Sequence, residues 1–220
     1  MAHMQRWRFL FPLVEVVAMA TLLFSYIWWW GDGVSEAFPI CFALYAGIGL
    51  LAHIRARETP ADIGIRLDTL IPAGRIALAA TLLIGLVAVG LGALLGSLHF
   101  PPLPLWPHAL WYGVIWGGIQ QYGLLAIFYR RFRELFGGGR GPRLAASAMF
   151  ALFHIPNPFL MGVTFAAGVF SCWLYRRSPN LFVLGIMHGL VSLTINSSLP
   201  EWVTMGMRVG PGYFHFIPRP

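Results

Sequence analysis

The sequence predicts an all-α fold, a polytopic bundle of about seven transmembrane helices that forms a single membrane domain over residues 1–220. Hydrophobic residues make up 58% of the chain and charged residues only 10%, and the mean hydropathy is +0.70. A soluble domain has about 25% charged residues, so lipid is the expected solvent. At about 20 residues per crossing, the spans leave no room for a separate soluble domain.

The helix boundaries follow from the charges and prolines between the apolar runs. Residues 9–30 form a run too long for the hydrophobic core of a signal peptide, and no small-residue cleavage site follows it. We therefore expect this helix to stay in the mature protein. Prolines within residues 155–158 favour a chain break there. The other predicted spans are residues 37–54, 76–96, 108–129, 143–160, 161–175 and 180–197, with 59–70 as a cytoplasmic loop or surface helix and 199–220 as an external tail.

The placement of the arginines predicts the orientation. All 15 cations are arginine, and Lys and Arg concentrate in cytoplasmic loops. The opposite loops carry Asp32 and Glu36, then the uncharged stretch 97–107, then residues 155–159. We expect a cytoplasmic N-terminus and a periplasmic or extracellular C-terminus in a bacterial inner membrane, and no nucleic-acid partner. The clustered arginines are Arg6, Arg8, Arg55, Arg57, Arg66, Arg75, Arg130, Arg131, Arg133, Arg140, Arg143, Arg176 and Arg177.

Three predicted spans carry polar side chains at a similar depth. Gln120 and Gln121 belong to the fourth span, His154 to the fifth and His188 to the seventh. At 1.5 Å per residue from the nearest arginine, Gln121, His154 and His188 lie about 14, 17 and 17 Å deep, near the middle of a core about 30 Å thick. Polar groups are costly there, so we expect these four to gather in one buried pocket.

Helical spacing adds supporting residues to this pocket. Phe150 shares a face with His154 at i, i+4, and Ser192 shares one with His188. Asn196 lies further along the same stripe. Elsewhere, Glu15 is the only carboxylate within a predicted span, and we expect it to pair with an arginine on the cytoplasmic side.

The ordered motifs resemble the CAAX-protease and bacteriocin-processing (CPBP, or Abi) family of intramembrane endopeptidases. That family shows Glu-Glu-x-x-x-Arg on one transmembrane helix, Phe-x-x-x-His on the next and a final His-x-x-x-Asn or Asp. The corresponding segments here are 120–125, 150–154 and 188–192, in the same order. The resemblance covers about residues 60–198 and is strongest over 117–192.

The departures from the family pattern bear on activity. The resemblance implies that the first glutamate activates water, that the histidines position water and oxyanion, and that the arginine supports the glutamates. Gln120, Gln121 and Leu125 replace these three groups, and an amide cannot accept a proton near neutral pH. We therefore predict a protease homologue with lost or altered glutamate-dependent peptidase activity, which binds a membrane partner or a lipid-like ligand.

Several alternatives stay open. The chain could be an active CAAX-like endopeptidase that uses His154, His188 and a Gln-oriented water on a hydrophobic or prenylated peptide. It could instead be a structural subunit of a larger membrane complex. The glutamines could serve as interhelical hydrogen-bonding groups, and the helix glycines, including Gly90, Gly92, Gly117 and Gly118, suggest close helix packing.

The expected ligands are limited by the available side chains. Membrane lipids, a hydrophobic or prenylated peptide and a membrane-protein partner are the expected binding partners. No metal and no cofactor are expected, because two histidines without a nearby acid fall short of the three or four ligands that zinc needs.

Overall fold

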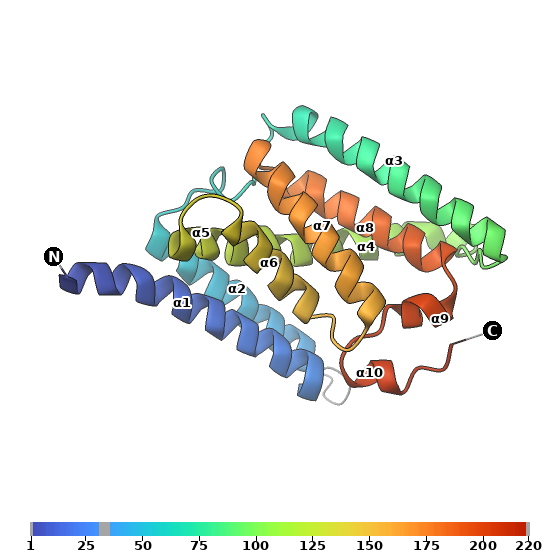
Figure 1. Ribbon diagram of the computed structural model, residues 1–220, viewed down its shortest axis with the longest axis horizontal. Helices are drawn as coiled ribbons and strands as arrows, with labels where there is room; N and C mark the ends of the chain where they lie inside the picture. Colours follow the sequence, from blue (N-terminus) through green and yellow to red (C-terminus); the bar gives the residue numbers. More distant parts are fainter. Residues whose placement is uncertain (1, 31–35, 219–220) are drawn as a thin grey trace. The chain divides into compact units, whose positions relative to one another are not determined.

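The computed structural model describes the backbone of residues 2–30 and 36–218, and the side chains from Phe9 onward. Within these residues all regular secondary structure is helical (Figure 1), which confirms the predicted fold class. Asp32, used above in the topology prediction, lies outside the described residues. The chain divides into two compact units; the single membrane domain stays a prediction. The first unit comprises Met1–Thr59, Leu124–Cys172 and Val209–His215, and the second comprises Pro60–Gly123, Trp173–Arg208 and Phe216–Pro220.

Five described segments are long and apolar enough to cross a membrane. They coincide with five of the seven predicted spans. Their large apolar side chains are widely exposed, as for Leu94, which is 86% exposed, and lipid is the solvent in which such a surface is stable. The total number of spans and their orientation stay predictions. The five segments are Phe9–Trp30, Ala37–Ala56 (α2), Leu70–Leu95 (α3), Pro158–Arg177 (α7) and Leu181–Ser198 (α8).

The other two predicted spans differ in the structure. Residues 108–129 are divided between α4 (Trp106–Gln121) and a π-helical segment, η3 (Tyr122–Tyr129). The prediction of one helix over 143–160 is wrong. α6 (Gly141–Leu152) ends eight residues before residue 160, and α7 already begins at Pro158. The break over 155–158 is present as expected. Its reason is local: Pro156 and Pro158 lack a backbone donor, while the Asn157 side chain accepts from the Leu160 amide at 3.0 Å.

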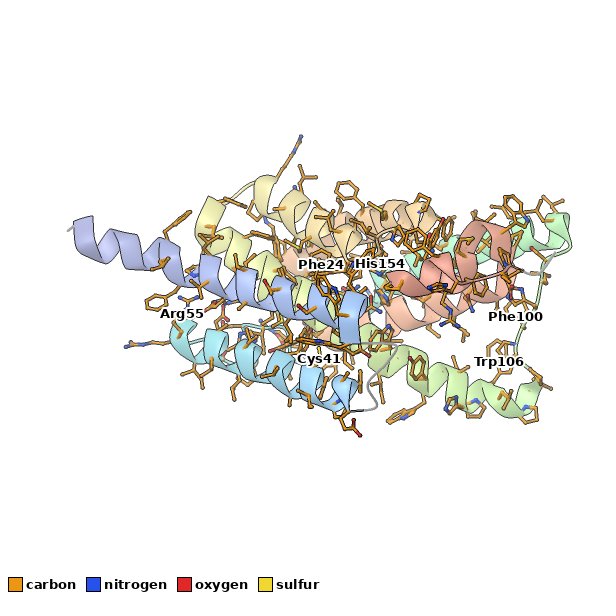
Figure 2. All side chains as sticks on the ribbon, turned by 90° about the horizontal axis from the view of Figure 1, so that it is seen from below. Phe24, Cys41, Arg55, Phe100, Trp106 and His154 are labelled. Atoms are coloured by element: carbon orange, nitrogen blue, oxygen red, sulfur yellow. The ribbon has the colours of Figure 1, made fainter. Side chains whose placement is uncertain are left out.

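The first unit contains α1 (Ala2–Ser25), α2, α5 (Arg130–Phe136), α6 and α7 as far as Cys172. Phe24 of α1 packs on Phe153, with ring centroids 4.9 Å apart, directly before His154 in the chain (Figure 2). A Cβ added at Gly168 of α7 would lie 3.0 Å from Ser147 of α6. This close approach joins the two helices on either side of the break.

The second unit contains α3, α4 and α8. The carbonyl of Ser198, at the end of α8, accepts the Ser97 hydroxyl at 2.7 Å. Asn180 begins α8, because its side chain accepts from the Val183 amide at 3.1 Å and donates to the Arg66 carbonyl at 2.8 Å. These bonds fix both ends of α8, the helix that carries His188.

The segment predicted as an external tail, residues 199–220, contains local structure. It forms α9 (Glu201–Thr204), a single 3₁₀ turn (Met205–Met207) and α10 (Pro211–Phe214). Thr204 is buried, and the Gly210 amide donates to the Ile155 carbonyl at 2.9 Å. The last of these contacts lies within the first unit and supports the chain break before α7.

Candidate functional site

Gln121 and His188 form a hydrogen-bonded pair in the second unit. The amide nitrogen Nε2 of Gln121 donates to Nδ1 of His188 at 3.1 Å. Because an amide NH₂ group can only donate, Nδ1 must be unprotonated, and the proton of the neutral imidazole is on Nε2. In this pair His188 therefore offers an N–H donor through Nε2 and not a basic lone pair.

Glycines at the crossing of α4 and α8 allow this bond. A Cβ added at Gly117 would lie 2.6 Å from the Gly185 carbonyl oxygen and 2.8 Å from the Gly189 amide nitrogen. Only the absence of side chains lets the two backbones approach so closely. Gly117 precedes Gln121 by one helical turn, and Gly185 and Gly189 flank His188, so the crossing brings the two polar side chains within bonding distance.

The other polar atom of Gln121 is buried without a partner. Its side chain is 1% exposed, and Oε1 accepts no hydrogen bond from any described residue. A buried acceptor left unsatisfied costs about 1–3 kcal/mol. A donor from a bound water or ligand would remove this cost, so Gln121 marks a place where an additional hydrogen-bonding group is favoured.

Three other predicted site residues lie in the same unit. Gln120, Ser192 and Asn196 are half-buried. Within the described structure none of them is hydrogen-bonded to Gln121 or His188. They neighbour the pair along α4 and α8, and their role in a pocket stays a prediction.

His154 and Phe150 lie in the first unit. The Nδ1 atom of His154 donates to the Phe150 carbonyl at 2.7 Å, and the two rings meet edge to face at 5.0 Å. A carbonyl can only accept, so in the neutral ring the proton is on Nδ1 and the lone pair is on Nε2. His154 and His188 thus have opposite tautomers. The gathering of all these residues in one chamber stays a prediction, because they are divided between the two units.

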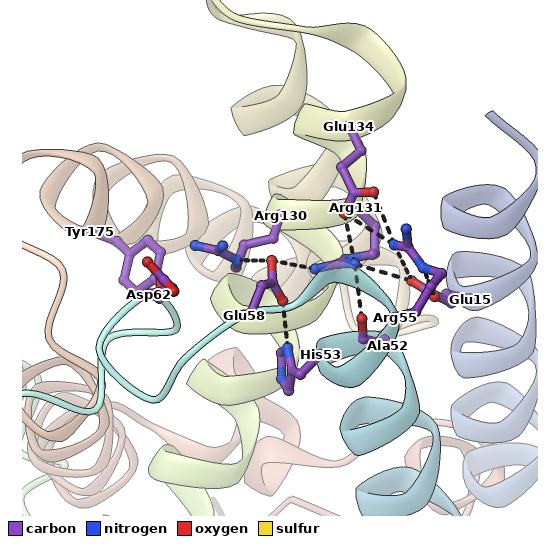
Figure 3. Close-up of polar contacts among 10 residues, drawn as sticks. All are labelled: Glu15, Ala52, His53, Arg55, Glu58, Asp62, Arg130, Arg131, Glu134 and Tyr175. Atoms are coloured by element: carbon purple, nitrogen blue, oxygen red, sulfur yellow. Dashed lines mark hydrogen bonds and ion pairs between the residues drawn. The ribbon is translucent and has the colours of Figure 1, made fainter. Parts of the chain in front are cut away.

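A charged cluster that the sequence analysis did not identify also lies in the first unit (Figure 3). Its centre is Arg131, whose side chain is 0% exposed. We call it the Arg131 cluster, and its members are Glu15, His53, Arg55, Glu58, Arg130, Arg131 and Glu134. The expected pairing of Glu15 with an arginine is confirmed, since Arg55 lies 2.5 Å and Arg131 3.3 Å from its carboxylate.

Glu58 joins the loop after α2 to this cluster. Its carboxylate lies 2.6 Å from Arg130, 2.6 Å from Arg131 and 2.6 Å from His53 Nδ1. Burial alone would raise the pKa of Glu58, but the hydrogen bond from His53 and the two arginines outweigh burial and hold the pKa below its ordinary value. The carboxylate is therefore ionised at neutral pH. The signal available in the sequence was the pair Arg130 and Arg131 directly after a predicted span.

The described residues offer no cluster of three or more His, Cys, Asp or Glu side chains that could hold a metal ion. The residues most suited to ligand contact are instead the amide of Gln121 and the two imidazoles. These groups can form hydrogen bonds, and His154 carries a lone pair on Nε2.

Comparison with known proteins agrees with the family resemblance. The family described as Rce1-like, type II CAAX prenyl endopeptidase, matches residues 122–194. The matched segment includes Phe150, His154, His188 and Ser192 and begins directly after Gln121. No curated protein and no solved structure gives a significant match to the chain.

Proposed function

We propose that this multi-pass membrane protein is a homologue of intramembrane proteases that binds its ligand without hydrolysing it. Two observations support the proposal: residues 122–194 match the Rce1-like family of CAAX prenyl endopeptidases, and five described helices are long and apolar enough to span a membrane. The ligand in this proposal is a lipid-like molecule or the hydrophobic segment of a membrane partner. It contacts Gln121 and His188. The proposed location is a bacterial inner membrane.

The hydrogen-bonding pattern of the pair supports binding over hydrolysis. Gln121 cannot act as a base, and its bond to Nδ1 leaves His188 as a donor through Nε2. Leu125, at the position of the family arginine, is fully buried and apolar. The pair therefore offers an acceptor, Gln121 Oε1, but no carboxylate that would take a proton from water.

The observation that carries the proposal is the buried, unpartnered Oε1 of Gln121. A ligand with a hydrogen-bond donor, such as a peptide group or a hydroxyl, could bond to Oε1. Each such bond contributes about 0.5–1.5 kcal/mol, which corresponds to roughly a twofold to twelvefold change in Kd.

The test uses the full chain in lipid vesicles with a fluorescent prenylated peptide. Gln121→Leu removes Oε1 and should raise the Kd by about twofold to twelvefold for the one bond lost. Thr81→Val is the matched control, because the Thr81 hydroxyl only donates to Ala77 within its own helix, at 2.8 Å. Equal affinities of the two variants would refute a role for Gln121 in binding.

One observation favours an active peptidase as the second candidate. The Nδ1 bond to Phe150 leaves the Nε2 lone pair of His154 able to accept a proton. In this candidate mechanism, His154 is the base that activates the water. The enzyme would then cleave the peptide, and His154→Ala would abolish cleavage while leaving peptide binding intact.

A further inference from the structure

The first unit contains a cavity that belongs to neither Gln121 nor His188. It has a volume of about 410 Å³, within the range of small-ligand pockets. It lies between α5, the glycine loop that follows it (residues 137–139) and the loop after α2, which carries Glu58. Its lining residues are Glu58, Arg130, Arg133, Glu134, Gly137 and Gly138.

One arginine that lines this cavity has no carboxylate partner among the described residues. In the Arg131 cluster the three carboxylates of Glu15, Glu58 and Glu134 are all paired with guanidinium groups. Arg133 lies outside these pairs. It makes no ion pair with any described residue, and its one contact with a charged or aromatic group there is with the Tyr129 ring, 5.9 Å from the ring centre. The paired arginines are Arg55, Arg130 and Arg131.

The glycine loop supplies backbone donors beside this arginine. Gly137 and Gly139 adopt positive φ angles of 73° and 98°, a conformation that L side chains rarely adopt. The amides of Gly138 and Gly139 donate to no described protein group. An anion in the cavity would thus meet a guanidinium without a carboxylate partner among the described residues, and one lining residue, Gly138, whose amide makes no backbone hydrogen bond there.

We propose that this cavity binds the phosphate group of an anionic ligand, with Arg133 as the charged contact. The carboxylates of Glu58 and Glu134 do not oppose such binding, because the Arg131 cluster neutralises them. α5 directly follows the predicted span 108–129, and this prediction would place α5 at the depth of the lipid headgroups. Basic pockets at such positions suit anionic headgroups. This site does not depend on the function proposed for Gln121 and His188.

The experiment compares the full-length protein with two charge-matched variants. Native mass spectrometry in detergent measures how much phosphatidylglycerol and phosphatidylcholine each retains. Arg133→Gln should weaken retention of phosphatidylglycerol by about tenfold, as expected for loss of a charged hydrogen bond. Arg140→Gln removes the same charge seven residues along the chain, directly before α6, but Arg140 does not line the cavity, so retention should change less than twofold (a factor of two being about 0.4 kcal/mol).

A third variant and a soluble anion complete the test. Gly138 lines the cavity, so the bulky side chain of Gly138→Phe should occupy it without changing charge and should also lower retention. An added Cβ at Gly138 meets nothing within 4 Å, so the substitution fits without a clash at this atom. If inorganic phosphate stabilises the wild type but not Arg133→Gln, and phosphatidylglycerol is not preferred, the phosphate comes from a soluble ligand. Equal retention by Arg133→Gln and Arg140→Gln, with no response to phosphate, would overturn the proposal.

Discussion

Replacing Gly117 by alanine tests whether the close crossing of α4 and α8 positions the Gln121–His188 pair. The added methyl group would lie 2.6 Å from the Gly185 carbonyl oxygen, whereas ordinary contacts begin at 3.4 Å. The helices must therefore separate locally by about 0.8 Å. The obstructing atoms belong to backbone, so no side-chain rotation relieves the clash.

The size of the effect follows from a comparison with Gly118→Ala. Both substitutions gain the same helix propensity, up to about 1 kcal/mol, but a Cβ at Gly118 meets nothing within 4 Å. The difference between the two variants is therefore the overpacking term alone, about 1–3 kcal/mol. A separation of about 0.8 Å would also lengthen the 3.1 Å bond between Gln121 and His188 beyond hydrogen-bonding distance.

The assay measures unfolding of both variants in mixed micelles, together with binding of the prenylated peptide. We expect Gly117→Ala to be less stable than Gly118→Ala by about 1–3 kcal/mol and to bind as weakly as Gln121→Leu, with unchanged helix content. Equal stability and equal binding in the two variants would refute the argument that backbone contact at this crossing holds the pair together.

Three further changes test other parts of the structure. Arg131→Met should lower the free energy of unfolding by about 3–5 kcal/mol, because it leaves carboxylates without their buried partner; a loss below about 1 kcal/mol, typical of an exposed ion pair, would contradict this. Since the pKa of Glu58 is held below its ordinary value of 4.5, its contribution to stability is present above that pH and is lost as the pH falls through the lowered pKa. Glu58→Gln should therefore flatten the acid side of the stability curve, measured by thermal unfolding at several pH values, and an unchanged slope would refute the assignment. Asn157→Ala should cost about 1 kcal/mol, because the bond from the Leu160 amide is lost at the start of α7; no change in the unfolding free energy would show that this cap is dispensable.

Much of the fold follows from local sequence patterns. Apolar runs predicted the five spanning helices, because hydropathy reports directly on lipid-exposed segments. The prolines over 155–158 predicted the break, but the short α6 was not expected, since the end of a helix depends on caps and packing as well as on composition. Of the glycines expected to pack closely, Gly92 and Gly117 are confirmed, whereas Gly90 faces open space, where the prediction is wrong.

The polar network was harder to predict from the sequence. The Arg131 cluster joins Glu15, Glu58 and Glu134 from three separate segments of the chain. No local pattern encodes such a contact, because each arginine also fits the simpler role of a topology signal. The tautomers of His154 and His188 could not be predicted from the sequence either, because they depend on which atom lies within hydrogen-bonding distance of each Nδ1 in the folded chain.

The central claim is that this chain binds a hydrophobic ligand through Gln121 and His188 without cleaving it. The most direct measurement follows binding and cleavage of one fluorescent prenylated peptide in the same vesicle sample. We predict saturable binding that weakens in Gln121→Leu and in His188→Ala, with the peptide recovered intact. Time-dependent cleavage by the wild type that disappears in His154→Ala would contradict the claim and establish the active peptidase instead.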